Sequence, residues 1–193
     1  MYTRKIMKKA IENIFRESIQ VNEATLKCNT EKIINAVKAV TAALKKKHKI
    51  ILFGNGGSAA DSQHIAAEFI GRFQKERKSL AAIALTTDSS ILTALSNDYG
   101  YDIVFARQIE GLGQRGDIAF GISTSGNSKN VIEGIKKAKR KGLTTISLTG
   151  CGGGKLAKLT DISLVVPSKK TARIQESHIC IAHTICELVE KKF

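Results

Sequence analysis

The sequence has no long apolar run, a single proline and no pair of cysteines spaced as Cys-x-x-Cys. No apolar stretch reaches the ~18 residues that a membrane span requires, so we expect no transmembrane helix. The charged first residues continue into Glu12, Arg16 and Glu17 instead of an apolar segment, so we expect no secretory signal. In a chain of this length without such a signal, four scattered cysteines predict reduced thiols and a cytoplasmic protein.

Aromatic residues are also scarce, at 5% of the chain, and they do not interleave with basic residues in the pattern that stacks nucleic-acid bases. The net charge is nevertheless +14, from 31 basic and 17 acidic residues. Such a surplus can attract nucleic acid, anionic membranes or phosphorylated metabolites. Because most of it is lysine, we interpret it as a solvated surface and expect neither nucleic acid nor membrane as a partner.

Length and composition favour one globular domain, since 193 residues with 42% hydrophobic content can bury a sizeable core. Apolar residues recur at helical spacing through residue 48, which predicts two helices broken near Cys28–Thr30. Short apolar runs then alternate with helical segments. We therefore expect a helical extension at 1–48 and an α/β core at 49–193 within a single domain covering 1–193.

The core pattern predicts five strands separated by helices. The predicted strands are Lys49–Gly54, Leu80–Thr86, Asp117–Ile122, Thr144–Thr149 and Ile162–Pro167. The predicted helices are Ser58–Phe73, Asp88–Ser96, Ile103–Leu112, Ser128–Lys141 and Arg173–Lys192. This alternation is typical of a parallel sheet with helices on both faces, in which ligands bind beyond the carboxyl ends of the strands.

Residues 123–128 read Ser-Thr-Ser-Gly-Asn-Ser and fall at such a strand-to-helix turn. Hydroxyl groups donate hydrogen bonds, Gly126 allows close backbone approach, and the first N–H groups of a helix face an anion. The loop contains no Lys or Arg, which suits a phosphomonoester held by neutral donors. The alternative is a plain Ser/Gly turn with Ser128 as the helix N-cap. We favour the phosphate site.

Two other glycine-rich segments are weaker signals for nucleotides. Gly54, Gly56 and Ala59 match Gly-x-Gly-x-x-Ala, but the acidic residue expected about 20 positions later is missing, since the next strand ends at Asp88. We therefore do not expect a nicotinamide cofactor, and we interpret Asn55 and Ser58 as donors to a small ligand. The Gly150–Lys155 segment is shorter than a P-loop and is followed by Leu156 where a hydroxyl belongs, so we predict a flexible loop.

His64 and Glu68 are four residues apart and share one face of a predicted helix. Such a pair can bind one divalent metal or transfer a proton, although it can also be a solvated polar face. Gln175 and His183 lie eight residues apart on the terminal helix, which separates them by about 12 Å along its axis. They meet at one atom only if the helix start is bent or if different subunits supply them.

Five segments spread over nearly the whole chain form a joint pattern: Gly54-Asn-Gly-Gly-Ser58, His64–Arg72, Asn97-Asp98, Ile122–Ser128 and Thr171–His178. Together they resemble the phosphoheptose isomerase family, the sedoheptulose 7-phosphate isomerases of the sugar isomerase (SIS) domain superfamily. The resemblance implies the SIS fold, a three-layer α/β/α sandwich with a five-stranded parallel sheet, preceded here by two N-terminal helices. It also implies a homotetramer with active sites between subunits.

The resemblance implies roles for individual residues. The phosphate would be held by Ser123, Thr124, Ser125 and Ser128. The sugar would be contacted by Asn55, Gly56, Gly57, Ser58, Arg72, Asn97, Asp98 and Gln175. Glu68 and His183 would be the acid/base pair. One zinc ion per subunit would be held by His64, Glu68, Gln175 and His183. Some members have Asp where Ala172 stands, so a sugar contact from that position is lost here.

The activity implied is that of an aldose–ketose isomerase, an intramolecular oxidoreductase. It would convert sedoheptulose 7-phosphate to D-glycero-D-manno-heptose 7-phosphate through an enediol, for bacterial surface polysaccharide such as lipopolysaccharide. A carboxylate bound tightly to zinc is a poorer base, so Glu68 would not act as zinc ligand and as base in the same step. The alternative is a non-catalytic SIS-domain protein, either replication-initiator-associating or sugar-phosphate-sensing. A sensor needs only the phosphate loop, so retention of all four proposed zinc ligands argues against it.

Overall fold

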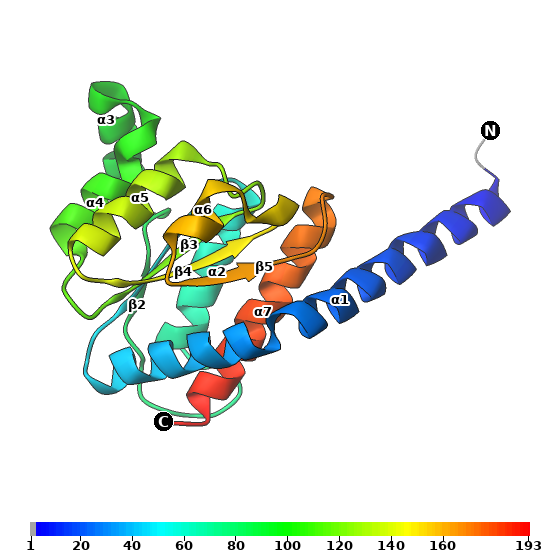
Figure 1. The fold of residues 1–193 in the computed structure, drawn as a ribbon, viewed down its shortest axis with the longest axis horizontal. Coiled ribbons are helices and arrows are strands. Elements are labelled where there is room, and N and C mark those ends of the chain that lie inside the picture. The colour runs from blue at the N-terminus through cyan, green and yellow to red at the C-terminus, as the bar shows by residue number, and fades with distance from the viewer. Residues whose placement is uncertain (1–2) are drawn as a thin grey trace.

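A computed structural model describes residues 3–193, which form a five-stranded parallel sheet with helices on both faces (Figure 1). The strand order is β2-β1-β3-β4-β5, and all four pairings are parallel. The strands are β1 Ile50–Gly54, β2 Ala82–Ala84, β3 Ile118–Ser123, β4 Thr144–Thr149 and β5 Ile162–Val165. The predicted α/β/α fold is therefore confirmed, and each predicted strand is present.

The helices form two layers around the sheet. Among the described residues they are α1 Arg4–Lys45, α2 Gly57–Ile70, α3 Ser89–Tyr99, α4 Val104–Leu112, α5 Lys129–Arg140, α6 Gly154–Leu159 and α7 Thr171–Glu190, with short 3-10 turns at Tyr101–Ile103 and Cys151–Gly153. Figure 1 shows α1, α2 and α7 on one face of the sheet and α4, α5 and α6 on the other. The α3 helix stands off from the body and buries none of its residues.

Strand β1 shows why the sheet is sandwiched. Ile50 and Leu52 pack into the core under α1, α2 and α7, whereas Ile51 and Phe53 pack into the core under α4 and α5. Side chains alternate between the two faces of a strand, so an unbroken apolar run has both faces covered. Fully burying an aromatic or aliphatic side chain contributes about 1.5–3 kcal/mol, and Phe53, whose ring lies 5.4 Å from that of Phe105, is fully buried.

The two predicted N-terminal helices are a single helix, α1, so the predicted break near Cys28–Thr30 is wrong. Polar side chains there bond inside the helix, since the Asn29 amide donates to the Thr25 carbonyl (3.0 Å) and the Thr30 hydroxyl to the Leu26 carbonyl (2.6 Å). Such bonds bend helices rather than end them, and α1 bends as it reaches the body in Figure 1.

Asn29 also explains why α1 stays helical at this point. Its amide donates to the Val165 carbonyl (3.0 Å), and its carbonyl oxygen accepts from the Val165 N–H (3.1 Å). Asn29 is buried and occupies the open edge of β5 much as a neighbouring strand would. A residue type that reads as a helix breaker in the sequence therefore fixes the helix to the sheet.

Element ends differ elsewhere by a few residues. Helix α2 begins at Gly57, so Ser58 lies inside its first turn and makes no capping bond, whereas Asp88 caps α3 through a 2.9 Å bond from the Ile91 N–H. The Gly150–Lys155 segment is not a flexible loop but forms the Cys151–Gly153 turn and the start of α6.

In the part of the chain that the structure describes, no helix is both long enough and apolar enough to traverse a bilayer.

The first half of α1 projects beyond the body of the domain (Figure 1). It carries large apolar side chains that are exposed in the single chain: Ile6, Met7, Ile11, Ile14, Phe15 and Ile19.

Candidate active site

Two loops meet at the carboxyl edge of the sheet, where the strand order reverses between β1 and β3. Gly54 at the end of β1 is in register with Ile122 near the end of β3, so the loops that follow lie side by side. A reciprocal amide pair joins the first loop to the start of α5, because Asn55 Nδ2 donates to Asn130 Oδ1 (2.9 Å) and Asn130 Nδ2 to Asn55 Oδ1 (2.8 Å). This is the position at which open α/β sheets bind ligands.

Three serine hydroxyls converge in residues Ser123–Ser128, hereafter the hydroxyl loop. Ser123 Oγ lies 2.9 Å from Ser128 Oγ and 3.4 Å from Ser125 Oγ. Ser128 occupies the N-cap position of α5, but its side chain makes no capping bond, so the plain-turn alternative loses its main support. Gly126 adopts a φ of +65°, which closes the turn at little cost for glycine. The arrangement offers clustered neutral donors to an anion.

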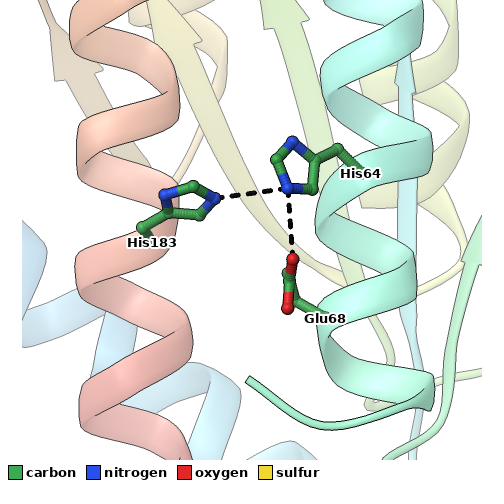
Figure 2. Close-up of side chains that lie close together, drawn as sticks. All are labelled: His64, Glu68 and His183. Carbon is green, nitrogen blue, oxygen red and sulfur yellow. Dashed lines mark hydrogen bonds and ion pairs between the residues drawn. The ribbon is translucent and has the colours of Figure 1, made fainter. Parts of the chain in front are cut away.

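His64, Glu68 and His183 converge on the facing sides of α2 and α7 (Figure 2). His64 Nε2 lies 3.1 Å from Glu68 Oε1 and 3.4 Å from His183 Nε2. The three side chains are exposed or half-buried, and one ligand atom from each lies within 4.8 Å of the others. Two imidazoles and one carboxylate at this spacing can hold a metal ion.

The loop that follows α2 packs against His183. The Phe73 ring lies 5.3 Å from the His183 ring, and its backbone N–H donates to Glu190 Oε1 (2.9 Å). Glu190 Oε2 accepts two further backbone N–H groups, from Gln74 and Lys75, each at 2.8 Å. A buried carboxylate on α7 therefore fixes the loop that sets one side of the His183 environment.

Arg77 completes this support. Its Nε donates to Glu190 Oε1 (3.1 Å) and its Nη2 to the Glu68 carbonyl (2.8 Å), with both members of the ion pair almost fully buried. Burial alone would raise the pKa of Glu190, but the backbone N–H donors and the Arg77 guanidinium outweigh it and lower that pKa. The carboxylate is thus held charged, and the end of α2 that carries Glu68 is tied to α7.

Two other titratable groups lie nearby. His178 is fully buried on α7, and burial lowers its pKa to about 4 against the opposing effect of the Thr149 backbone, so its ring is neutral at pH 7. Among residues 3–193, neither ring nitrogen has a well-formed hydrogen bond. Burial also raises the pKa of Asp61 one turn before His64, against the lowering effect of that histidine. His178 is therefore unsuited to proton transfer at neutral pH.

Four predicted site residues lie apart from the cluster within one chain. Gln175 packs its amide against Gly57 at the start of α2, and α7 is an unbroken helix, so the bent start that would bring it to His183 is absent. Side chains lean toward the helix N-terminus, which points Gln175 further away. Arg72 is exposed and lies 3.6 Å from Glu76. Asn97 and Asp98 pair with each other at 2.9 Å on α3.

Sequence analysis did not identify four residues that support the site: Asn130, Phe73, Arg77 and Glu190. Glu190 follows Cys186 by four residues and so falls on the apolar face of the terminal helix. A charge at such a position must be paired when buried, which was the one available signal. Its partners come from residues more than 110 positions earlier in the chain.

Comparison with known proteins identifies relatives over most of the chain. The SIS domain family model matches residues 14–150. A curated phosphoheptose isomerase from Aquifex aeolicus is 55% identical over 185 residues, covering 96% of this chain and 97% of the relative. One from Sulfurimonas denitrificans is 53% identical over 190 residues and covers 96% of each.

Solved structures give the same result. The structure of a phosphoheptose isomerase from Neisseria gonorrhoeae superposes with a TM-score of 0.91 at 45% identity, covering 96% of this chain and 99% of that one. The similarity thus extends over sheet, both helical layers and the two converging loops.

Proposed function

Because the chain belongs to the SIS domain family, among the phosphoheptose isomerases, we propose that it is an aldose–ketose isomerase that converts sedoheptulose 7-phosphate to D-glycero-D-manno-heptose 7-phosphate. Its product would supply heptose for a surface polysaccharide. One observation of the structure carries the proposal, namely the convergence of His64, Glu68 and His183 on α2 and α7, where α2 begins at the sheet edge that carries the hydroxyl loop. A non-catalytic binding module is not favoured, because it has no use for that cluster.

The spacing of the two parts suits a seven-carbon sugar phosphate. Gly57 begins α2 beside the hydroxyl loop, and His64 follows seven residues later, about 10 Å along the helix axis. A phosphate bound by Ser123, Ser125 and Ser128 would place the far end of an extended heptose chain at the level of His64. The reacting carbons C1 and C2 are at that end.

Glu68 and His183 are the proposed acid/base pair. Glu68 removes the proton from C1 of the ketose, the C–H electrons form the C1=C2 double bond of the enediol, and His183 delivers a proton to the C2 oxygen. Glu68 then returns its proton to C2, while His183 accepts the proton of the C1 hydroxyl as the aldehyde forms. Each general acid or base contributes typically ~10²–10⁴-fold.

Zinc is the proposed metal, and the donor set fits it. Nitrogens bound to one tetrahedral zinc ion at ~2.0–2.1 Å lie about 3.3 Å apart, and the two imidazole Nε2 atoms of His64 and His183 are 3.4 Å apart. Glu68 would be the third ligand, and Gln175 would be the fourth only if a neighbouring subunit supplies it, because α7 is straight. When bound, zinc would polarise the C1 and C2 oxygens of the open-chain sugar.

Incubation of the purified protein with sedoheptulose 7-phosphate tests the function. We expect heptose 7-phosphate to form, and removal of metal by a chelator to lower the rate at least about tenfold, with recovery on addition of zinc. Unphosphorylated sedoheptulose is the matched control, and it should be converted poorly because the hydroxyl loop has no anion to bind. A zinc-loaded protein that forms no product would contradict the proposal.

A homotetramer with active sites between subunits is also proposed. The exposed apolar residues on the projecting half of α1 support it, because a helix face of this kind is stabilised by a partner. It would also let Arg72, Asn97 and Asp98 reach the sugar bound to a neighbouring subunit.

Light scattering should give a particle mass four times the 20.9 kDa of the chain. Phe15→Glu, which places a charge on the exposed apolar face of α1, should lower the mass, whereas Glu12→Gln on the same helix should not. A monomeric mass for the unsubstituted protein would end this proposal.

A further inference from the structure

We propose that Gly150–Leu156, hereafter the glycine brace, is a positioning element that sets the backbone of the hydroxyl loop for phosphate binding. The inference rests on the proposed function, because it takes the hydroxyl loop as the phosphate site. It assigns a role to a segment whose glycines suggest a nucleotide loop in the sequence but which forms no P-loop in the structure.

Three hydrogen bonds join the brace to the loop. The Gly150 N–H donates to the Thr124 carbonyl (3.0 Å), and the Leu156 N–H donates to the Gly126 carbonyl (2.9 Å). The Lys155 N–H donates to Asn127 Oδ1 (3.1 Å). Each bond turns an acceptor of the loop toward the brace. The brace thus bonds three of the four consecutive loop residues from Thr124 to Asn127.

These bonds determine where the loop's donors point. A trans peptide is planar, so the N–H of one residue points opposite to the carbonyl of the residue before it. With the Thr124 carbonyl held by Gly150, the Ser125 N–H is directed away from the brace. The Thr124 and Gly126 carbonyls, which would repel an anion, are occupied on the brace side, and the Ser125 N–H and the serine hydroxyls remain as donors for the phosphate.

The contact between the two backbones tolerates no side chain. A methyl group added at Gly154 would lie 2.6 Å from the Gly126 carbonyl oxygen and 2.7 Å from that of Ser125. One added at Gly126 would collide in turn with the Gly153 carbonyl. By contrast, a methyl group at Gly152 would meet no atom within 4 Å. Gly152 and Gly154 both have positive φ, at +77° and +55°, so substitution strains both backbones, and it strains Gly154 more because its ψ is −152° against 12° at Gly152.

The brace is itself fixed to the rest of the domain. Leu156 is fully buried, and the Cys151 N–H donates to the Ser168 carbonyl (2.9 Å) in the segment that leads into α7. Ile174 of α7 packs against Gly150. Because α7 also carries His183, one rigid helix contacts the brace at one end and the metal-ligand cluster further along, which holds the loop in register with the reacting groups.

Gly154→Ala and Gly152→Ala form a matched pair that tests the brace. We expect Gly154→Ala to raise both the Kd for inorganic phosphate, measured by calorimetry, and the KM for sedoheptulose 7-phosphate by about tenfold or more, with kcat changed less than about threefold. Gly152→Ala adds a methyl group at a left-handed backbone position (φ 77°, ψ 12°) without the contact, so its Kd and KM should stay within about twofold of the unsubstituted protein. A merely structural defect would not produce this split between KM and kcat.

A second pair covers the case in which Gly154→Ala does not fold. Lys155→Pro removes the N–H that bonds Asn127 and is tolerated in the first turn of a helix, whereas Lys155→Gln keeps that N–H and also removes the charge. The phosphate Kd should rise at least about threefold for Lys155→Pro relative to Lys155→Gln.

The outcomes separate the brace from the enzyme activity. Equal phosphate affinities within each folded pair would overturn the brace, as would an unsubstituted protein that binds no phosphate. Differing phosphate affinities without turnover of sedoheptulose 7-phosphate would support the brace and contradict the proposed function instead.

Discussion

Glu68→Gln should lower the turnover of sedoheptulose 7-phosphate by about 10²–10⁴-fold, and His183→Gln by a similar factor. The amide of Gln has the shape of the carboxylate or approaches that of the ring, but it cannot take up a proton at neutral pH. The measurement is kcat by a coupled assay of heptose 7-phosphate formation, at saturating substrate and with added zinc. Glu133→Gln, which removes an exposed carboxylate on α5, is the control and should leave kcat unchanged.

The zinc content of the same variants separates the two roles of Glu68. Loss of activity with zinc retained would assign Glu68 as the base, whereas loss of both would assign it mainly as a ligand. The close approach of Glu68 to His64, at 3.1 Å, permits either role. Near-normal turnover in both Glu68→Gln and His183→Gln would remove the acid/base pair from the mechanism.

The largest stability effect is expected at Glu190. Replacing it with Gln leaves the buried Arg77 guanidinium without its counter-charge and removes the anion that three backbone N–H groups face. Breaking a buried pair in this way costs about 3–5 kcal/mol. The free energy of unfolding from urea titration is the measurement, and Glu187→Gln, which removes an exposed pair with Lys191 on the same helix, should cost less than about 1 kcal/mol.

The pH dependence of stability gives an independent check. Because the pKa of Glu190 is lower in the folded chain than its usual 4.5, its contribution is fully present above that value and is lost as the pH falls. His178 acts in the same direction over a higher range, since its pKa falls from 6.5 to about 4 on folding. Glu190→Gln should therefore lack the decrease in stability that occurs below about pH 4.5, and it should keep the decrease that His178 causes at higher pH. An unfolding profile identical to that of the unsubstituted protein would contradict the assignment.

The strands were predictable because each is a short apolar run between turn residues, a pattern typical of a buried parallel strand. The break assigned near Cys28–Thr30 failed for a physical reason. Asn29 finds its partners in β5, 136 residues later in the chain, and a local pattern carries no information about them. The ordered Gly150–Lys155 segment was missed in the same way, since it is fixed by contacts with the hydroxyl loop.

The site was predictable in part. The four-residue spacing of His64 and Glu68 indicates a shared helix face, and the structure brings His183 to them from a helix more than 100 residues later. Their chemical roles remain proposals. The prediction that Gln175 cannot reach His183 along a straight helix is confirmed, because α7 is unbroken over the eight residues that separate them. No sequence pattern indicates which subunit supplies a residue, so the distance of Arg72, Asn97 and Asp98 from the cluster was not predictable.

The Asn29 amide has a consequence for how the chain behaves in a crowded solution. An unpaired edge strand can recruit a strand from another molecule, and repeated addition of this kind leads to fibrous aggregates. At Val165 both backbone groups are already taken by Asn29, and at the opposite margin β2 is only three residues long. Neither edge strand offers a long template. The Asn29 side chain at β5 and the short length of β2 therefore oppose sheet extension between molecules.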